Sequence, residues 1–347
     1  MALWVVRAGK HGEHENKFLK DNRVYATWEE LNEDLEKIKS KNDLLDHIQS
    51  LDRYKDEKLN TLKNWTYQLW PFVHEMNNGD WVIVPSKMKP AIHVAEILSS
   101  YHYDPSAEDP YYHYRDIKWI GTDILRSNFD QDLLYSFGAL GTIYQIKKNE
   151  AERRIKEMAV NGWKAKRTPT LTIKGNEQSD KSEGLVDLEL LARDQIAQLI
   201  SRKYKGHDLA RLVEALLKAQ GYTTFRSPAG PDKGIDILAA PGPLGFGNPR
   251  ICVQVKSGDS PVDLPTMNQL IGTMQNVQAD QGLLISWSGF KASIDREVPT
   301  QFFRVRLWDQ NAIIDELFNI YSKLDEDIRA ELPLKRIWAL TIQESDE

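Results

Sequence analysis

Apolar residues in the second half of the chain follow the spacings of helices and strands. A helical spacing predicts one helix over Leu188–Tyr204 and a second that has its cap at His207–Asp208 and stops at Gly221. Shorter apolar runs predict strands at Thr223–Arg226, Ile235–Ala239, Ile251–Val255, Gly282–Trp287 and Phe303–Leu307, and helices at Leu264–Val277 and Ile313–Tyr321. This order predicts an α/β core in which a mixed sheet is flanked by helices.

The first half of the chain has shorter and less regular apolar runs. They predict strands at Trp4–Arg7, Gly79–Pro85, Ala91–Leu98, Ile117–Ile120 and Thr142–Ile146. Trp28–Ile48 has the pattern of a polar helix, and Lys148–Met158 is rich in strong helix formers. Short strands at irregular spacing indicate a small α+β domain, built on a barrel or on a strongly curved sheet.

The change of pattern predicts two domains. A chain of 347 residues is long for a single core. Residues 175–184, GNEQSDKSEG, contain no apolar side chain and have the composition of a flexible linker. We therefore predict a first domain at 1–146, a helix and linker at 147–186, and a second domain at 187–347.

Composition favours a folded protein of a reducing compartment. Hydrophobic residues make up 41% of the chain, and no apolar run approaches the roughly 18 residues that cross a bilayer, so no membrane partner is expected. Cys252 is the single cysteine, which excludes an internal disulfide and a cysteine-based zinc cluster. The apolar N-terminal run is too short for a signal peptide, and we expect a cytoplasmic location.

The net charge of −6 is unusual for a protein that binds nucleic acid, because phosphate contacts need Lys and Arg. The local field over a groove matters more than the overall charge. Basic residues gather at Arg153–Arg154, Lys164–Arg167, Arg202–Lys205 and Arg304–Arg306. Each cluster is a candidate DNA contact, and each is also typical of an ordinary solvated face.

Three polar residues stand among apolar neighbours on two consecutive predicted strands. Asp236 lies between Ile235 and Ile237, and Gln254 and Lys256 alternate with valines. The loop that joins these strands, residues 241–249, consists mainly of Gly and Pro, so the strands are expected to form a hairpin. Because side chains alternate along a strand, the hairpin can bring Asp236, Gln254 and Lys256 together on one face.

This set of side chains has the chemistry of a metal-dependent phosphodiesterase. Hydrolysis of a phosphodiester is assisted by a metal that neutralises charge and lowers the pKa of water. Mg²⁺, or Mn²⁺ in its place, prefers oxygen ligands, which Asp236, the Gln254 amide and the Val255 carbonyl can supply. Lys256 would orient the water or stabilise the phosphorus centre. Each residue taken alone is also compatible with an ordinary surface position.

The block from Leu209 to Leu307 resembles the Mrr-type restriction endonucleases of the PD-(D/E)xK superfamily. The resemblance rests on Asp236, on Gln254-Val255-Lys256, in which Gln replaces the usual acid, and on the flanking strings at 216–222 and 281–286. It implies a restriction-endonuclease-like core. It also implies that Glu214 on the preceding helix assists the metal and that Gln269 on the following helix contacts DNA near the cleavage point; a solvated Glu214 is the alternative.

The first half resembles the PUA/EVE-like domains, which hold an extruded modified base between aromatic side chains. The resemblance rests on the first strand, on Gly79–Val84 and on Val94–Ile97, together with a dense aromatic set. A flipped base is recognised by stacking and by hydrogen bonds to its edge. We expect Trp28, Trp65 and Trp70 to line such a pocket; the alternative is that they pack in the core.

Together these features predict a Mg²⁺-dependent endodeoxyribonuclease that restricts modified double-stranded DNA, as a type IV-like enzyme of anti-phage defence. Cutting both strands needs two active sites, so a homodimer or a larger assembly is expected. One alternative is a non-specific defence nuclease that a ligand or a partner activates. A second is a non-catalytic nucleic-acid-binding protein that keeps the nuclease fold.

Overall fold

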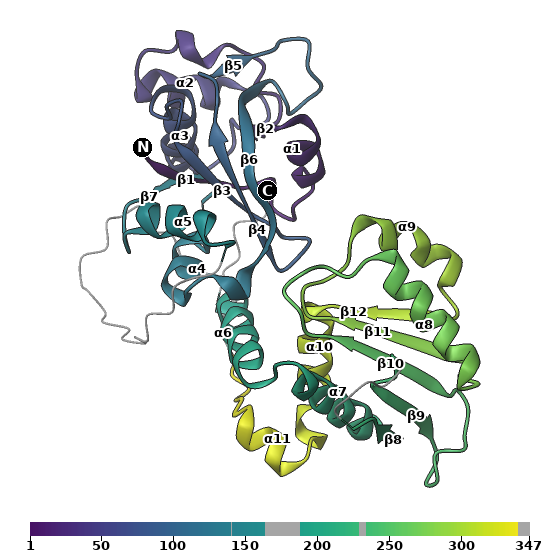
Figure 1. The fold of residues 1–347 in the computed structure, drawn as a ribbon. Helices are drawn as coiled ribbons and strands as arrows, with labels where there is room; N and C mark the ends of the chain where they lie inside the picture. The colour runs from purple at the N-terminus through teal and green to yellow at the C-terminus, as the bar shows by residue number, and fades with distance from the viewer. Residues whose placement is uncertain (140, 164–187, 229–233, 339–347) are drawn as a thin grey trace. The chain divides into compact units, whose positions relative to one another are not determined.

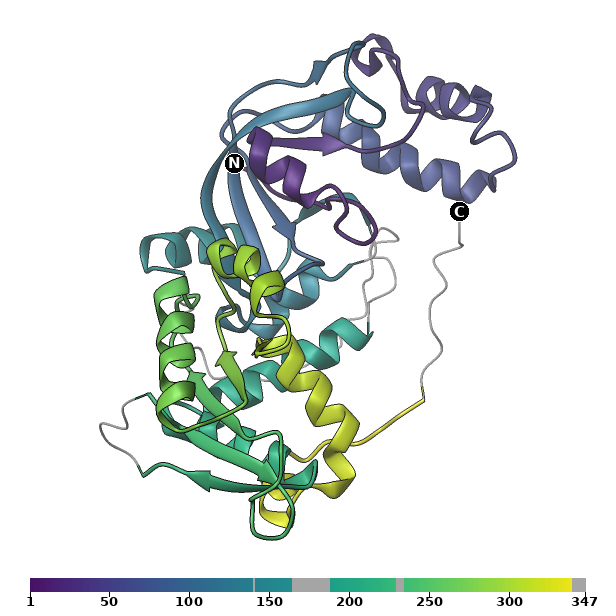
Figure 2. The same cartoon turned by 90° about the vertical axis from the view of Figure 1, so that its right-hand side faces the viewer.

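The chain forms two compact units, Met1–Leu191 and Ala192–Glu347 (Figure 1, Figure 2). The structure, a computed structural model, describes residues 1–139, 141–163, 188–228 and 234–338. The predicted linker at 175–184 and the basic cluster at 164–167 therefore lie outside the described residues. Each unit has a sheet with apolar clusters of its own.

The first unit is built on a sheet with strand order β2-β6-β4-β3-β1-β7, to which β5 adds by pairing with β6. Its strands are β1 (Leu3–Val6), β2 (Arg23–Ala26), β3 (Trp81–Pro85), β4 (Ala91–Ile97), β5 (His102–Tyr103), β6 (His113–Leu125) and β7 (Ile143–Ile146). Its helices are α1 (Glu15–Asp21), α2 (Lys41–Ser50), α3 (Leu59–His74), α4 (Gln131–Phe137) and α5 (Ala151–Val160), with short 3₁₀ turns η1 (Leu35–Lys37) and η2 (Arg126–Asn128). Strands β1 and β3 run parallel, and the other pairs are antiparallel.

Both faces of this sheet are buried. In β1, Trp4 and Val6 belong to the cluster that includes residues of α2 and α3, whereas Leu3 and Val5 belong to the cluster with α4 and α5. Bulges in the β4–β6 pairing, around Val94, bend the sheet. The curled sheet with its helices agrees with the expected α+β composition, while its closure into a PUA/EVE-like barrel stays a prediction.

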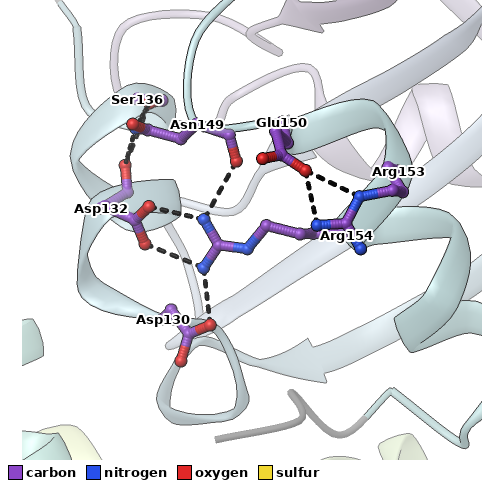
Figure 3. A network of polar contacts seen from close by, with 7 residues as sticks. All are labelled: Asp130, Asp132, Ser136, Asn149, Glu150, Arg153 and Arg154. Atoms are coloured by element: carbon purple, nitrogen blue, oxygen red, sulfur yellow. Dashed lines mark hydrogen bonds and ion pairs between the residues drawn. The ribbon is translucent and has the colours of Figure 1, made fainter. Parts of the chain in front are cut away.

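An ion-pair network joins α5 to the first turn of α4 and its N-cap residue (Figure 3). The guanidinium of Arg154 donates to Asp132 at 2.5 Å and to Asp130 at 2.6 Å, and Arg153 pairs with Glu150. Carboxylates therefore balance both charges of this predicted basic cluster within the first unit. The helix predicted at 148–158 is thus an integral part of this unit.

The sequence correctly predicted β1, β3, β4 and β7. The predicted helix over Trp28–Ile48 is wrong in its first half, because helical residues occur only in η1 and from Lys41 onward in that stretch. Glu30 has a left-handed φ of 60°, and Ser40 starts α2 by accepting a hydrogen bond from the Asp43 N–H. Local capping chemistry, which apolar spacing does not reveal, decides where this helix begins.

The second unit has a mixed sheet of five strands in the order β12-β11-β10-β9-β8. Its strands are β8 (Tyr222–Arg226), β9 (Ile237–Pro241), β10 (Ile251–Lys256), β11 (Gln281–Ser286) and β12 (Val305–Trp308). Its helices are α7 (His207–Ala219), α8 (Leu264–Asn276), α9 (Ala292–Gln301), α10 (Gln310–Ile320) and α11 (Glu326–Glu331), with the 3₁₀ turn η3 (Tyr321–Lys323); α6 (Leu188–Lys203) spans the division between the units. Strands β8, β9 and β10 pair antiparallel, and β10, β11 and β12 pair parallel.

Helices cover both faces of this sheet, as the α/β prediction requires. Residues of α6, α7 and α10 pack on the face that carries Ile237 and Val253. Residues of α8 and α9 pack on the other face, which carries Cys252 and Leu284. The predicted cap of α7 is wrong by one position, because the cap is Gly206 with a φ of 58° and His207 is already helical.

Candidate active site

The β9–β10 hairpin brings Asp236, Gln254 and Lys256 to one end of one sheet face. Leu238 stands opposite Cys252 and Ile237 opposite Val253, so the same register places Asp236 opposite Gln254. Directly opposite residues of an antiparallel pair share a face, and Lys256 shares it because it lies two positions after Gln254. This is the face on which α8 packs.

Asp236 lies just before β9 and is held by main-chain hydrogen bonds. Its carboxylate Oδ2 accepts from the Val255 N–H at 2.8 Å, and its own N–H donates to the Val253 carbonyl at 3.1 Å. The side chain is half-buried. Burial and the negative charge of Asp236 raise the pKa of the Cys252 thiol to about 11, as expected for a carboxylate near that side chain.

Gln254 is fully buried, and its amide has no hydrogen-bond partner for either polar atom in the described part of the chain. Leaving a buried polar group unpaired costs about 1–3 kcal/mol. Gly234, with a φ of 84°, packs directly on this amide, because a Cβ there would lie 3.1 Å from Gln254 Nε2. The same Cβ would lie 3.3 Å from Nε2 of Gln269, so α8 brings a second amide to the site.

The comparisons with known proteins assign the two halves of the chain separately. Residues 201–317 match the restriction endonuclease family Mrr_cat. The second unit contains an Mrr-type restriction endonuclease domain. This confirms the resemblance seen in Asp236 and in Gln254-Val255-Lys256. Residues 4–147 match a domain of unknown function, DUF8426, so the PUA/EVE-like resemblance of the first half stays a prediction.

Solved structures with some likeness to the chain include two restriction enzymes. The DNA modification-dependent restriction endonuclease AspBHI aligns with a TM-score of 0.33 and 13% identity, over 73% of this chain and 67% of its own. The MspJI restriction endonuclease in complex with a 27-mer oligonucleotide aligns with a TM-score of 0.31 and 13% identity, over 74% of this chain and 64% of its own. This chain therefore spans about two thirds of their length. No curated protein matches it.

The oxygen donors of the restriction endonuclease domain fit a hard divalent cation. Asp236 offers a carboxylate, and the buried Gln254 offers an amide oxygen to which no group in the described ranges donates a hydrogen bond. Val255 directs its N–H to Asp236, and the carbonyl of the same strand residue points to the same edge. Within the described residues no group of three or more His, Cys, Asp or Glu side chains could hold a metal, so neutral oxygens and water would complete the set.

The structure does not bring Glu214 to this cluster. Its carboxylate accepts hydrogen bonds from Thr224 at 3.0 Å and Arg226 at 2.9 Å, and pairs with Lys218 at 3.0 Å. Thr224 and Arg226 lie two and four positions after Tyr222 on β8, so they share its face. Tyr222 packs on the α7 side, opposite to the face of Gln254. Burial acts to raise the pKa of Glu214, but these hydrogen bonds outweigh it and lower the pKa.

The three tryptophans of the predicted base pocket have different surroundings in the first unit. Trp28 is 8% exposed and belongs to the apolar core. Trp65 packs edge-on against Tyr54, and Trp70 lies over His74 with ring centroids 4.1 Å apart. Trp65 and Trp70 are separated by five residues of α3, which is about 140° around the helix axis. A pocket lined by all three stays a prediction.

Sequence reasoning missed the contact that Gly234 makes with Gln254 and Gln269. The sequence shows only a glycine-bearing turn before Asp236. A glycine two residues before a candidate metal ligand is the one available signal, because close backbone approach is a common reason for glycine.

None of the helices in the described residues is long and apolar enough to cross a membrane.

Proposed function

We propose that this protein is a metal-dependent endodeoxyribonuclease whose active site consists of Asp236, Gln254 and Lys256. The observation that supports the proposal most strongly is the Gln254 amide of the restriction endonuclease domain, which is fully buried and has no hydrogen-bond partner among the described residues. An unpaired buried amide is costly to the fold, so a ligand outside the chain explains it better than a structural role does.

Asp236, Gln254 and the Val255 carbonyl would hold Mg²⁺, with Mn²⁺ as a substitute. When bound, the ion supplies charge neutralisation at the phosphate and lowers the pKa of water. The Lys256 ammonium donates hydrogen bonds to the attacking water or to a non-bridging phosphate oxygen. The water oxygen forms a bond to phosphorus, the phosphorus–oxygen bond to one deoxyribose breaks, and the released oxygen takes up a proton.

The first unit would select the target as a reader of modified bases. Its dense aromatic set, which includes Trp65 and Trp70, is the feature that supports this part of the proposal, because a flipped base is recognised by stacking. A protein that cleaves modified DNA would restrict invading phage DNA. Cleavage of both strands would require a homodimer or a larger assembly.

A cleavage assay tests the proposal. Purified protein is incubated with phage DNA that carries modified bases and with the same DNA made without them, each with Mg²⁺, with Mn²⁺ and with chelator. We expect metal-dependent cleavage of the modified DNA and its loss in Asp236→Ala and Lys256→Ala. Equal cleavage of both DNAs would instead favour a nuclease triggered by a ligand or partner. If the protein binds DNA but does not cleave it with Mg²⁺ or with Mn²⁺, a non-catalytic binding protein would be favoured.

A further inference from the structure

A short turn after β11 lies beside Lys256. Lys256 is paired with Ser286 in the parallel register of β10 and β11, and each of the two residues is the last of its strand. Paired residues of neighbouring strands lie on the same face of the sheet, about 4.8 Å apart. Ser286 is fully buried, and it is a polar residue on the face that carries Gln254 and the apolar Leu284. The turn that begins at Ser286 therefore borders Lys256 on this side of the site.

Residues 286–289 form a turn that two hydrogen bonds close. The Gly289 N–H donates to the Ser286 carbonyl at 3.1 Å, and the Ser286 hydroxyl donates to the Gly289 carbonyl at 2.7 Å. Gly289 has a φ of 77°, a left-handed conformation that favours glycine. Ser286, Trp287 and Ser288 are all buried, so this turn is packed into the fold and is not a surface loop.

Two further hydrogen bonds join the turn to the segment that follows β10. The Trp287 N–H donates to the Lys256 carbonyl at 2.9 Å. The Ser288 hydroxyl donates to the Ser260 carbonyl at 2.6 Å, across 28 residues of sequence. The segment 256–260 is therefore attached to the turn at both of its ends, and one of the two attachments is a serine side chain.

The place of the Lys256 ammonium depends on this main chain. Within the described ranges the ammonium has no hydrogen bond and no ion pair. A lysine side chain is a flexible four-carbon stem, so without a partner it is directed only by the main chain that carries it. Asp236 is held separately, because its carboxylate accepts from the Val255 N–H at 2.8 Å. A loss of the serine hydrogen bonds should therefore displace Lys256 and leave the carboxylate in place.

We propose that Ser286 and Ser288 are positioning residues for Lys256. The inference rests on the proposed nuclease function and adds two residues to its site. Ser286 closes the turn, and Ser288 connects the turn to Ser260. Together they hold the main chain at Lys256 so that its ammonium reaches the attacking water or the phosphate. The two hydroxyls act through Lys256 and do not contact the metal or the DNA.

Three variants and a control test the proposal in the full-length protein. Ser286→Ala and Ser288→Ala each remove one hydroxyl, and Ser288→Thr keeps it. The control is Ser293→Ala, which removes an exposed serine hydroxyl on α9. Calorimetry measures the thermal midpoint of each protein and the shift that Mg²⁺ produces. The kcat and KM for modified phage DNA are then measured with Mg²⁺, well below the midpoint of each variant.

We expect Ser286→Ala and Ser288→Ala to lower kcat about 10- to 100-fold, because a displacement of about 1 Å in an active site has an effect of this size. KM and the metal-induced shift stay those of the parent protein, because the metal ligands and the rest of the DNA contacts are unchanged. Ser288→Thr restores most of the kcat, and the control cleaves like the parent.

Three results overturn the proposal. A kcat equal to that of the parent in Ser286→Ala or Ser288→Ala removes the role of that serine. An alanine variant that loses kcat together with the metal-induced shift shows that the serine supports the whole site and not Lys256. A Ser288→Thr protein with the midpoint of the parent but the kcat of Ser288→Ala shows that the hydroxyl is not the group that matters.

Cleavage by the parent protein separates this inference from the proposed function. If the parent cleaves DNA and the alanine variants keep its kcat, the role of the two serines alone is overturned. If the parent cleaves no DNA with Mg²⁺ or with Mn²⁺, the proposed function is overturned, and this inference with it.

Discussion

At the scale of single residues, the buried amide of Gln254 lowers the stability of the fold and is expected to serve the active site. Both of its polar atoms lack a partner within the part of the chain that the structure describes, and the side chain is fully buried. An apolar side chain of similar volume should therefore suit the site better. We predict that Gln254→Met raises the free energy of unfolding by about 1–3 kcal/mol, the cost of an unpaired buried polar group. We also predict that it lowers cleavage by about 10- to 100-fold, the range for loss of groups around a metal.

Urea denaturation and the cleavage assay measure the two effects on the same protein. Gln254→Glu is the matched variant, because it keeps an oxygen in the place of the amide and is expected to retain metal-dependent cleavage. A Gln254→Met protein that is less stable than the parent would identify the amide as a structural group and remove the main support for the active site.

Gly234 supplies a second test at this scale. A Cβ there meets the amides of Gln254 and Gln269, and the φ of 84° disfavours any side chain. We predict that Gly234→Ala lowers cleavage about 10- to 100-fold, because small displacements in an active site have effects of this size. The control is Gly272→Ala, an exposed position in α8 where a Cβ has nothing within 4 Å. It should leave cleavage unchanged and stabilise the protein by about 0.5–1 kcal/mol; equal activity of both variants would contradict the assigned contact.

At the scale of elements, Glu214 on α7 accepts hydrogen bonds from Thr224 and Arg226 on β8 and so connects the two elements. Its pKa in the folded protein lies below the ordinary value of 4.5, so the carboxylate stabilises the fold above that pH and loses this contribution as pH falls through the folded pKa. We predict that Glu214→Gln destabilises the second unit by about 1–2 kcal/mol at pH 7, since its partners are partly exposed. The difference from the parent should shrink steadily below about pH 4.5.

Urea titrations at several pH values between neutral and acidic measure this prediction. Glu316→Gln is the control, because Glu316 pairs only with the exposed Gln220 side chain among the contacts seen in the described residues. If the difference in free energy of unfolding between Glu214→Gln and the parent protein stays constant with pH, the ionised carboxylate does not stabilise the contact between α7 and β8. If Glu214→Gln loses most of its cleavage activity while its stability changes little, Glu214 takes part in the active site.

Helix α3 shows where prediction from sequence stops. Its buried residues include Leu62, Leu69 and Phe72, but Pro71 removes a main-chain donor, and a proline inside a helix costs about 3 kcal/mol. No element was predicted for this stretch, although its buried residues follow a helical spacing, and the proline speaks against a helix that runs on to His74. The helix continues to His74 in the fold because Arg115, distant in sequence, donates to the carbonyls of Phe72 and Val73. A stabilising contact made through tertiary structure has no local signal.

The β9–β10 hairpin shows the opposite case. Alternation of polar and apolar residues placed Gln254 and Lys256 on one face, and the Gly- and Pro-rich loop located the turn. The shared position of Asp236, Gln254 and Lys256 therefore followed from local rules. The approach of Gln269 depends on how α8 packs on the sheet, so only the family resemblance suggested it. The position of Glu214 likewise depends on how α7 packs, and α7 lies on the other face of the sheet.

At the scale of the whole molecule, two separate sets of apolar clusters indicate two cooperative units. The clusters of the first unit contain residues from β1 to α5, and those of the second contain residues from α6 onward. We therefore expect two thermal transitions in calorimetry. The unit that binds a ligand can therefore be identified from the transition whose midpoint temperature the ligand raises.

Divalent metal should act on one transition alone. A ligand at 100 times its Kd stabilises the fold that binds it by about 2.7 kcal/mol, so Mg²⁺ or Mn²⁺ should raise the midpoint of the nuclease unit by several degrees. Asp236→Ala should abolish the shift, while Glu214→Gln, changed on the opposite face, should keep it. Chelator should return the parent protein to the lower midpoint. A shift that survives Asp236→Ala would place the metal elsewhere, and the absence of any shift at high metal concentration would refute a metal site built on Asp236 and Gln254. Because the readout is heat capacity and not cleavage, it remains decisive even when the modification that the first unit recognises is unknown.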